Sequence, residues 1–182
     1  MRRFIVCAAF LALGAMALDK VRNIVSAESS SAPGTQNIEV AFSPDGWAEA
    51  LVLKVIRSAK NSIRLAGYTF TSPSVVRALT DAKKRGVDVA TLVDYSNILS
   101  TSRSALNLLV HAGIPTRTVS TYPIHHDKYI VVDGLHVETG SFNYTTAARR
   151  NSENVLVVWN NSTVAAQYIT HWQNRWEQGQ PY

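Results

Sequence analysis

The sequence predicts an α/β domain in which a mixed β-sheet carries helices on both of its faces. In the first half, short apolar segments typical of strands alternate with amphipathic segments typical of helices. The second half is denser in strands, and a tight turn separates two of them. A helical segment then closes the chain. The resulting order, β-α-β-α-β-α-β and then β-β-β-α, is that of a sheet layered between helices.

The elements of the first half have recognisable ends. Ser72 and Pro73 form an N-cap followed by proline at the first helical position. That helix ends in a run of cations with Gly86 just beyond it, as expected for a helix C-terminus. From these signals and from hydrophobic periodicity we expect strands at 38–42, 63–68, 87–94 and 116–119, and helices at 47–59, 73–85 and 102–112.

The second half supplies the remaining strands and the last helix. Strands are expected at 128–132, 136–139 and 154–159, with a turn at Asp133-Gly134 joining the first two. The last helix, expected at 164–177, carries three aromatic side chains near one stripe, Tyr168, Trp172 and Trp176. We interpret this stripe as core packing.

The first 27 residues have the pattern of a secretory signal peptide. Arg2 and Arg3 precede an apolar run that is short for a membrane span, which needs ~20 residues. Cleavage is expected after Ala27, with Ala17 as the alternative, and an uncleaved N-terminal anchor is the competing interpretation. We therefore predict a secreted protein that touches a membrane only through this segment. Its parts are a signal peptide at 1–27, a flexible linker at 28–37 and one domain at 38–182.

The leader changes what charge and cysteine content imply. The 182-residue chain has a formal charge of +5, but residues 1–27 hold four of its 18 basic and one of its 13 acidic residues. The rest has only about +2, so overall charge is weak support for a nucleic-acid partner. The single cysteine, Cys7, also lies in the leader. The mature chain would hold no disulfide, thiolate metal site or cysteine nucleophile.

Two short segments carry polar groups suited to holding an anion. Side chains two apart on a strand share a face, so His126 and Lys128 would be neighbours. His125 would face the other way, and we expect a surface or packing role for it. The segment GSFN after the next strand supplies Ser141 and Asn143, which are neutral donors for phosphate oxygens. Taken separately, each segment is a weak signal.

Together these segments resemble the signature of the phospholipase D superfamily. The family's spacing is matched without departure by His126-x-Lys128-x4-Asp133 and then Gly140-Ser141-x-Asn143. Glu153 stands where many members have an acidic partner for the histidine. The resemblance covers the chain from about residue 38 to its end, and it is greatest to the small bacterial endonucleases of the family. Together with the leader, it implies a periplasmic protein.

The resemblance implies a role for each of these residues. His126 would be the nucleophile that attacks phosphorus and forms a phosphohistidine. Lys128 and Asn143 would hold the phosphate oxygens, and Ser141 would assist nearby. Glu153 would accept a hydrogen bond from the far ring nitrogen of His126 and so fix its tautomer and orientation.

Asp133 and any cofactor are expected to stay out of the reaction itself. Asp133 has the opposite parity to His126 along the strand, so we expect it to support the site rather than to contact phosphate. The family's chemistry is metal-independent. The sequence also shows neither a carboxylate cluster nor an HExxH motif, so no metal or other cofactor is expected.

The chain carries one copy of the motif, whereas the implied chemistry uses two histidines. One histidine attacks as a base, and a second protonates the leaving oxygen. Larger members of the superfamily carry two motifs in one chain. We therefore expect a homodimer in which two copies of His126 meet across a two-fold axis. Because the halves are identical, neither copy can be assigned as the acid in advance.

The substrate has three interpretations. A nuclease for DNA or RNA is favoured, and Arg149-Arg150 could engage flanking phosphates, although a solvated helix end is the competing interpretation. Nearby aromatic side chains could stack on bases, although core packing is their more common fate: Tyr122, Phe142 and Tyr144. A phospholipase or phosphatidyltransferase is the alternative. A non-enzymatic binding protein on the same fold is the third interpretation, and the intact motif argues against it.

Overall fold

A mixed eight-stranded β-sheet forms the centre of the fold, in the order β1-β7-β6-β5-β2-β3-β4-β8. The computed structural model describes residues 35–44, 47–99 and 102–182. The strands are β1 (Asn37–Ser43), β2 (Ser62–Gly67), β3 (Asp88–Asp94), β4 (Thr116–Val119), β5 (Lys128–Val132), β6 (His136–Gly140), β7 (Glu153–Trp159) and β8 (Gln180–Pro181). β2, β3 and β4 run parallel, and the other neighbouring pairs are antiparallel. The predicted mixed sheet is confirmed.

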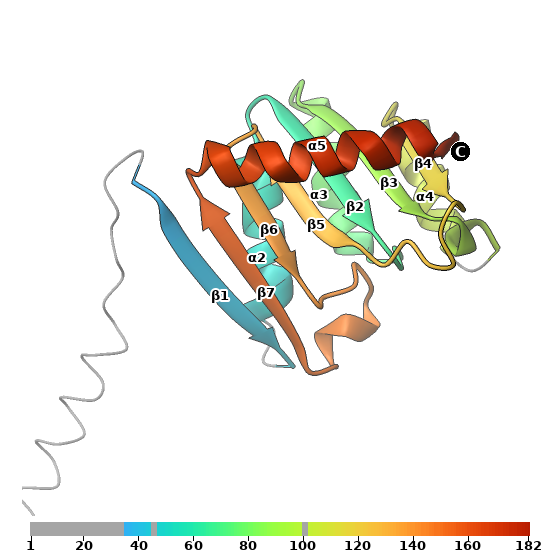
Figure 1. The fold of residues 1–182 in the computed structure, drawn as a ribbon. Coiled ribbons are helices and arrows are strands. Elements are labelled where there is room, and N and C mark those ends of the chain that lie inside the picture. Colours follow the sequence, from blue (N-terminus) through green and yellow to red (C-terminus); the bar gives the residue numbers. More distant parts are fainter. Residues whose placement is uncertain (1–34, 45–46, 100–101) are drawn as a thin grey trace, which may run out of the picture. The chain divides into compact units, whose positions relative to one another are not determined.

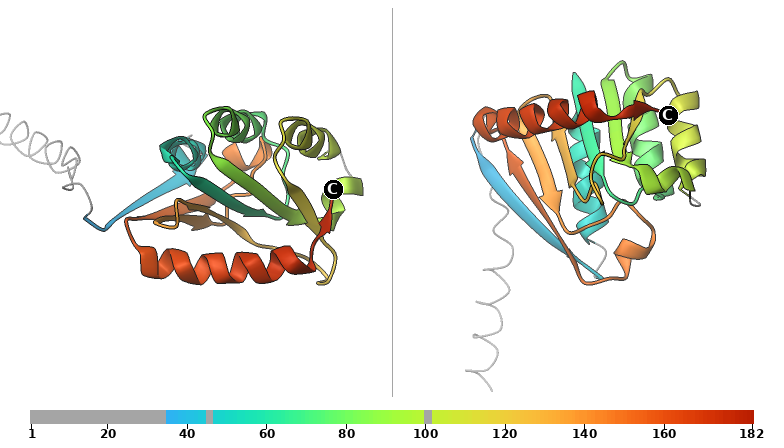
Figure 2. Two further views of the ribbon diagram at one scale, coloured as in Figure 1. Left: turned by 90° about the horizontal axis from the view of Figure 1, so that it is seen from above. Right: turned by 45° about the vertical axis from the view of Figure 1, so that its right-hand side comes forward.

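Helices cover both faces of this sheet, as predicted (Figures 1 and 2). One face carries α2 (Trp47–Ser58), α3 (Pro73–Lys84) and α4 (Arg103–His111). α5 (Ser162–Gln178) crosses the opposite face, over β6, β5, β2 and β4. The short 3-10 helix η2 (Ala147–Arg149) follows the GSFN segment. A second one, η1 (Tyr95–Leu99), and strand β8 were not predicted, because segments this short show no periodicity.

The predicted signal peptide and most of the linker lie outside the described residues. The expectations for cleavage and secretion therefore stay predictions. Within the described ranges, no helix is both long and apolar enough to cross a membrane.

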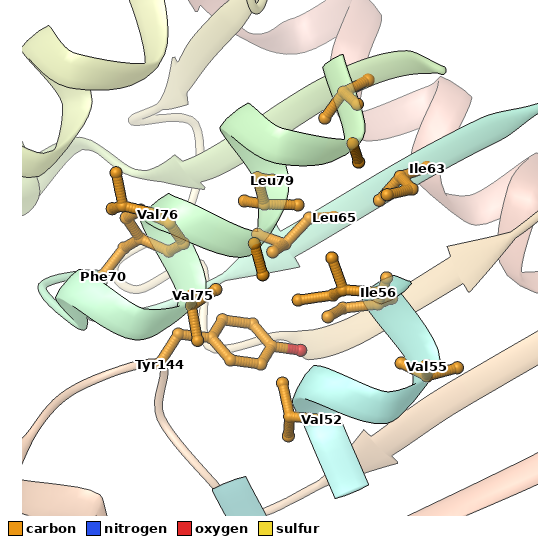
Figure 3. Close-up of a cluster of buried hydrophobic side chains, with 14 of the residues drawn as sticks. Val52, Val55, Ile56, Ile63, Leu65, Phe70, Val75, Val76, Leu79 and Tyr144 are labelled. Atoms are coloured by element: carbon orange, nitrogen blue, oxygen red, sulfur yellow. The ribbon is translucent and has the colours of Figure 1, made fainter. Parts of the chain in front are cut away.

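The larger hydrophobic core lies between the sheet and the layer of α2, α3 and α4. Figure 3 shows Val52 and Ile56 of α2 beside Val75 of α3, with the ring of Tyr144 in the same cluster. α3 begins as its sequence predicts, because the Ser72 hydroxyl accepts a hydrogen bond from the Val75 backbone N–H at 3.4 Å. The core therefore fixes the start of α3 against the segment that contains Tyr144.

A smaller core lies between the sheet and α5. Trp172 and Trp176 stack with ring centroids 4.6 Å apart, and Trp172 Nε1 donates to the Leu65 carbonyl oxygen at 3.0 Å. Tyr168 packs edge-on against Tyr129, at 4.9 Å between centroids. The aromatic stripe of the last helix is thus core packing, as predicted.

Candidate active site

The motif residues lie where several strands begin or end, at one edge of the sheet. β2 reaches this edge with its carboxyl end, and its Gly67 pairs with Lys128, the first residue of β5. β6 ends there at Gly140, which pairs with Val155 near the start of β7. Ligand sites of α/β sheets lie at such an edge, beyond the carboxyl ends of the parallel strands. The arrangement collects His126, Lys128, Ser141, Asn143 and Glu153.

His126 and Lys128 are neighbours, as the sequence predicted. Lys128 Nζ lies 3.2 Å from His126 Nδ1 and donates to the His126 carbonyl oxygen at 2.9 Å. The strand starts only at Lys128, so these contacts, rather than strand alternation, bring the two side chains together. Burial lowers the pKa of the Lys128 ammonium group, and the carboxylates of Asp127 and Glu153 act in the opposite direction. A cation fixed beside the imidazole is suited to stabilising charge on a bound phosphate.

His125 is a packing residue, as predicted. Its side chain is 2% exposed, and its Nδ1 lies 3.5 Å from Asp127. Burial lowers the pKa of its imidazole, whereas the charges of Asp127 and Asp94 raise it. The His125 backbone N–H donates to Asp94 Oδ2 at 2.7 Å. This bond holds the chain in place just before His126, and it does not depend on the His125 side chain.

The segment around His126 is also tied to α5. Asp127 Oδ2 lies 2.9 Å from His171 Nε2, a contact that sequence reasoning missed because the two residues are far apart in the chain. An open cavity of about 430 Å³ lies beside this contact, between α5 and strands β5 and β6. Its lining includes His126, Lys128, Thr139, Gln167, Tyr168 and His171. In the described part of the chain, no group of three or more His, Cys, Asp or Glu side chains is placed to hold a metal ion.

Ser141 contacts a different group from the one expected. Its hydroxyl donates to Glu153 Oε2 at 2.6 Å. The Ser141 hydroxyl oxygen also accepts from the backbone N–H and the side-chain amide of Asn154, at 3.1 and 3.3 Å. A hydroxyl has one hydrogen to donate, so Ser141 positions Glu153 and has none left for a phosphate. While this bond is made, Ser141 supports the site through Glu153, and a direct contact between Ser141 and the phosphate stays a prediction.

The other residues of the GSFN segment have separate reasons for their positions. A Cβ at Gly140 would lie 2.2 Å from the Asn154 carbonyl oxygen, so the close approach of β7 requires glycine here. Asn143 Oδ1 is buried and has no hydrogen-bond partner among the described residues. A buried acceptor without a partner is costly, and only a hydrogen-bond donor on a bound ligand would satisfy it. Phe142 and Tyr144 are fully buried, so neither can stack on a base.

Glu153 is held by hydrogen bonds from two side chains. Its Oε2 accepts from Ser141, and its Oε1 accepts from Asn151 Nδ2 at 3.0 Å. Among the described residues no hydrogen bond joins Glu153 to His126. The orienting bond expected from the resemblance is therefore not made among the described residues, and it stays a prediction.

Asp133 lies at the far end of β5, roughly 16 Å along the strand from Lys128 at ~3.3 Å per residue. Its carboxylate accepts from the backbone N–H groups of Lys60, Asn61 and Ser62 at 2.8–2.9 Å. Burial acts to raise the pKa of Asp133, but these donors outweigh it and the pKa is lowered. The expected supporting role beside the site is therefore corrected, because Asp133 instead secures the turn that precedes β2.

Tyr68 belongs to the site although the sequence did not indicate it. Its ring centroid lies 4.6 Å from that of His126, and Lys128 Nζ lies 5.3 Å from it. Asn97 Nδ2 donates to the Tyr68 carbonyl oxygen and so fixes this residue. The only sequence signal was its position as the last residue of the strand expected at 63–68; in the structure β2 ends one residue earlier, at Gly67. Tyr68 packs against the His126–Lys128 pair and restricts the orientation of the imidazole.

A buried carboxyl group lies in the core behind the GSFN segment. Glu138 on β6 is 1% exposed, and Tyr144 donates its hydroxyl to Glu138 Oε2 at 2.8 Å. Burial raises the pKa of Glu138 to about 8, and the Tyr144 hydrogen bond offsets part of that rise. Near neutral pH this side chain is therefore largely a neutral acid in the folded protein.

Glu138→Gln should remove a pH-dependent loss of stability. In the unfolded chain the carboxyl has a pKa of about 4.5, so between that pH and about 8 only the unfolded state loses the proton. The free energy of unfolding then falls by ~1.4 kcal/mol per pH unit, and the decline ends above the folded pKa. The glutamine variant cannot ionise, and its amide oxygen can still accept from Tyr144. Urea unfolding from pH 5 to 8 should show a stability advantage of the variant that grows by about 2–4 kcal/mol.

The matched control for this measurement is Glu177→Gln, since Glu177 is exposed on α5. It should follow the wild-type pH dependence. Parallel stability curves for Glu138→Gln and wild type would show that Glu138 is ionised in the folded protein.

The fold and the site define an α/β phosphodiesterase domain with a His-x-Lys pair and a GSxN segment at one sheet edge. Residues 52–176 match the domain family described as "Cardiolipin synthase, PLD-like domain". The chain therefore belongs to the phospholipase D-like family, as its motif predicted, and it is a phosphodiesterase of that family.

Individual relatives agree with this assignment. Nuc from Salmonella typhimurium, a phospholipase D family member of known structure, is 49% identical, with a TM-score of 0.80 over 81% of this chain and 99% of Nuc. A protein named phospholipase D from Rickettsia bellii is 35% identical over 139 residues, which cover 76% of this chain and 68% of the relative. A mitochondrial cardiolipin hydrolase from Xenopus laevis is 32% identical over 131 residues, 71% of this chain and 61% of that protein.

Proposed function

We propose that this phosphodiesterase is a non-specific endonuclease that cleaves DNA, with RNA as a second candidate substrate, and that it needs no metal ion. The observation that carries the proposal is the assembled His126–Lys128 pair in a chain that is 49% identical to Nuc, a phospholipase D family member. The motif of this chain also resembles that of the small bacterial endonucleases of the family. Of the two arginines beyond the GSFN segment, Arg149 is paired with Glu49 at 3.3 Å. Arg150 is exposed and forms no side-chain bond with a described residue, so it is suited to a flanking phosphate.

Cleavage would proceed through a covalent intermediate on His126. Nε2 of His126 gives its electron pair to phosphorus, the bond from phosphorus to the leaving oxygen breaks, and a second, protonated histidine transfers its proton to that oxygen. Water then attacks the phosphohistidine and gives a proton to the second histidine. This second step releases the phosphate monoester and regenerates His126.

Lys128 and Asn143 would stabilise the charge that develops on the phosphate oxygens. Lys128 donates one N–H to the His126 carbonyl oxygen. When Nε2 of His126 is the nucleophile, Nδ1 carries the ring proton and cannot accept from Lys128, so the other two N–H groups of the ammonium are left for the substrate. Asn143 would donate from its side-chain Nδ2, because the amide oxygen can only accept. A fixed charge and a fixed dipole in a partly buried site need no reorganisation as the reaction proceeds.

The second histidine would come from a second copy of the chain, in a homodimer with the active site at the two-fold interface. An uncovered apolar face next to the site supports this assembly. On β1, Ile38, Val40 and Phe42 are each more than half exposed, at 54, 53 and 58%. They alternate along the strand and so share one face of the sheet. Figure 1 shows that α5 lies over β6 and the strands that follow it in the sheet, and that it leaves β1 uncovered. Apolar surface of this extent is typical of a contact between proteins.

The site of action would be the bacterial periplasm. The support is the basic start, apolar run and small residues of 1–27, together with a mature chain that would lack cysteine. A chain without thiols folds in an oxidising compartment without the risk of wrong disulfides.

The alternative function is hydrolysis or transfer of phospholipids. The observation in its favour is that relatives above 30% identity are named phospholipase D and mitochondrial cardiolipin hydrolase. The His126–Lys128 pair is compatible with either substrate, because both present a phosphodiester to the nucleophile.

Direct assays on both substrates separate the two functions. Purified protein is incubated with supercoiled plasmid, and separately with phosphatidylcholine vesicles, with EDTA in both reactions. We expect plasmid breakdown and no release of phosphatidic acid. The breakdown should survive EDTA, because the nucleophile is a side chain rather than a metal-bound water. The His126→Asn variant is the control for a contaminating nuclease. Phosphatidic acid release with an intact plasmid would support the alternative.

A further inference from the structure

A basic groove lies on the helical face of the fold, between α2 and α3. We call it the α2–α3 groove; its volume is about 570 Å³ and its lining is Arg57, Pro73, Ser74, Arg77, Ala78, Asp81 and Arg85. Arg77, Asp81 and Arg85 are spaced four residues apart, so they form one stripe along α3 and its C-cap. Arg57 faces them from the last turn of α2.

The three arginines of the groove are available to a ligand. All three are exposed, and none forms an ion pair with a carboxylate in the described part of the chain. Arg85 makes one long hydrogen bond, 3.5 Å, to the Ala59 carbonyl oxygen. Asp81 is the one acidic residue in the lining, and its carboxylate lies 3.6 Å from Lys84 Nζ. The groove therefore carries a net positive charge, and its arginines are not neutralised by ion pairs with described carboxylates.

The groove starts at the catalytic edge of the sheet. The end of the groove nearest this edge is formed by Pro73 and Ser74, the first residues of α3. The backbone N–H groups just before them, of Thr71 and Ser72, donate to the Tyr144 carbonyl oxygen at 2.9 and 2.8 Å. Tyr144 follows Asn143 directly. From this end, α3 extends for 12 residues, about 18 Å at ~1.5 Å per residue, toward Arg85.

We propose that the α2–α3 groove binds the phosphates of the nucleic-acid strand beyond the bond that is cleaved. This inference rests on the proposed nuclease function. A strand that leaves the GSFN segment would pass Ser74 and then meet Arg77, Arg57 and Arg85 in turn. Guanidinium groups are well suited to phosphate because they offer paired donors in a fixed plane.

The groove holds the backbone and does not read the bases. Its lining contains no aromatic side chain on which a base could stack, and it has few uncharged donors for base edges. Binding there should therefore be independent of sequence and strongly dependent on salt. A non-specific nuclease would gain affinity for long strands in this way without selecting a sequence.

Binding of oligonucleotides of two lengths tests the proposal. In the inactive His126→Asn background, the groove variant combines Arg57→Ala, Arg77→Ala and Arg85→Ala. At 0.15 M salt, fluorescence anisotropy should show a Kd for a 24-nucleotide single strand that rises roughly 10- to 50-fold. The slope of log Kd against log salt should fall by about 2, at ~0.7 per phosphate contact. Affinity for a trinucleotide should be unchanged, because it is too short to leave the site.

Three controls separate charge, folding and catalysis. The matching lysine variant at the same three positions should keep most of the salt slope. Arg103 is exposed on α4, outside the groove, so Arg103→Ala should leave the slope unchanged. In the active background, the groove variant should hydrolyse bis(p-nitrophenyl) phosphate at the wild-type rate. Unchanged 24-mer affinity and salt slope, with plasmid cleavage by the wild type intact, would overturn the groove assignment alone. A wild type that hydrolyses the small diester but neither binds nor cleaves nucleic acid would overturn the proposed function itself.

Discussion

His126→Asn is expected to abolish turnover, by a factor of at least ~10⁴, while His125→Asn keeps activity within about tenfold of the wild type. The two histidines are adjacent in sequence but differ in surroundings. His126 lies beside Lys128 Nζ and the Tyr68 ring, whereas the His125 side chain is buried against Asp127. Asparagine at 126 cannot donate a ring nitrogen to phosphorus, so no covalent intermediate can form. The rate of bis(p-nitrophenyl) phosphate hydrolysis measures both variants without depending on the natural substrate.

Folding must be controlled in this comparison, because His125 is the more buried of the two residues. The backbone bond from His125 to Asp94 survives the substitution, so we expect at most a modest loss of stability. Thermal unfolding checks this. Brief reaction with a ³²P-labelled diester, followed by denaturation in base, should leave label on the wild type and on His125→Asn only. A folded but inactive and unlabelled His125→Asn protein, with His126→Asn active, would show that the motif has been aligned to the wrong histidine.

Most of the fold could be predicted because its elements carry their own local signals. β4 and β5 have the predicted bounds, and α3 begins at Pro73 after its Ser72 cap. In these elements periodicity and capping act over a few residues, so neighbours in sequence determine them. β8 has no such signal. It forms because the chain returns from α5 to the edge of β4, where Arg117 pairs with Pro181.

The site was predicted in composition better than in geometry. Spacing identified His126, Lys128 and Asn143, and the structure brings all three to one sheet edge. The partners of the side chains were not predictable, because they come from residues distant in sequence. Ser141 donates to a carboxylate 12 residues away, and Asp133 accepts from backbone groups more than 70 residues away.

Strand parity correctly predicted that Asp133 does not contact the phosphate site, but the reason it supplied was incomplete. It excluded a phosphate contact from the direction of the side chain, but distance along β5 already places Asp133 at the opposite edge. For Ser141, donor counting was the step that sequence reasoning lacked. A hydroxyl near a carboxylate and an amide uses its single hydrogen within the protein, and only the structure shows those two neighbours.

Mixing wild-type subunits with His126→Asn subunits should inactivate the wild type in proportion to the mixed dimers formed. If each working site needs one His126 as nucleophile and its copy as acid, a mixed dimer holds only half of the pair. After subunit exchange with about a ninefold excess of the variant, activity per wild-type chain should fall to about one tenth. Differently tagged subunits, recovered together by affinity capture, confirm that exchange has taken place.

His111→Asn subunits are the matched control, because His111 is exposed on α4 and its ring has one hydrogen-bond partner among the described residues, the Asn107 carbonyl oxygen. Their excess should leave activity per intact His126 chain unchanged. Full wild-type activity in proven mixed dimers would mean that each chain completes the reaction without the second copy of His126. Sedimentation supplies a second test, since a monomer that stays fully active at high dilution excludes the shared site. In either case the acid would have to come from the same chain, and the buried His125 and the Asp127-bound His171 are its remaining histidines near His126.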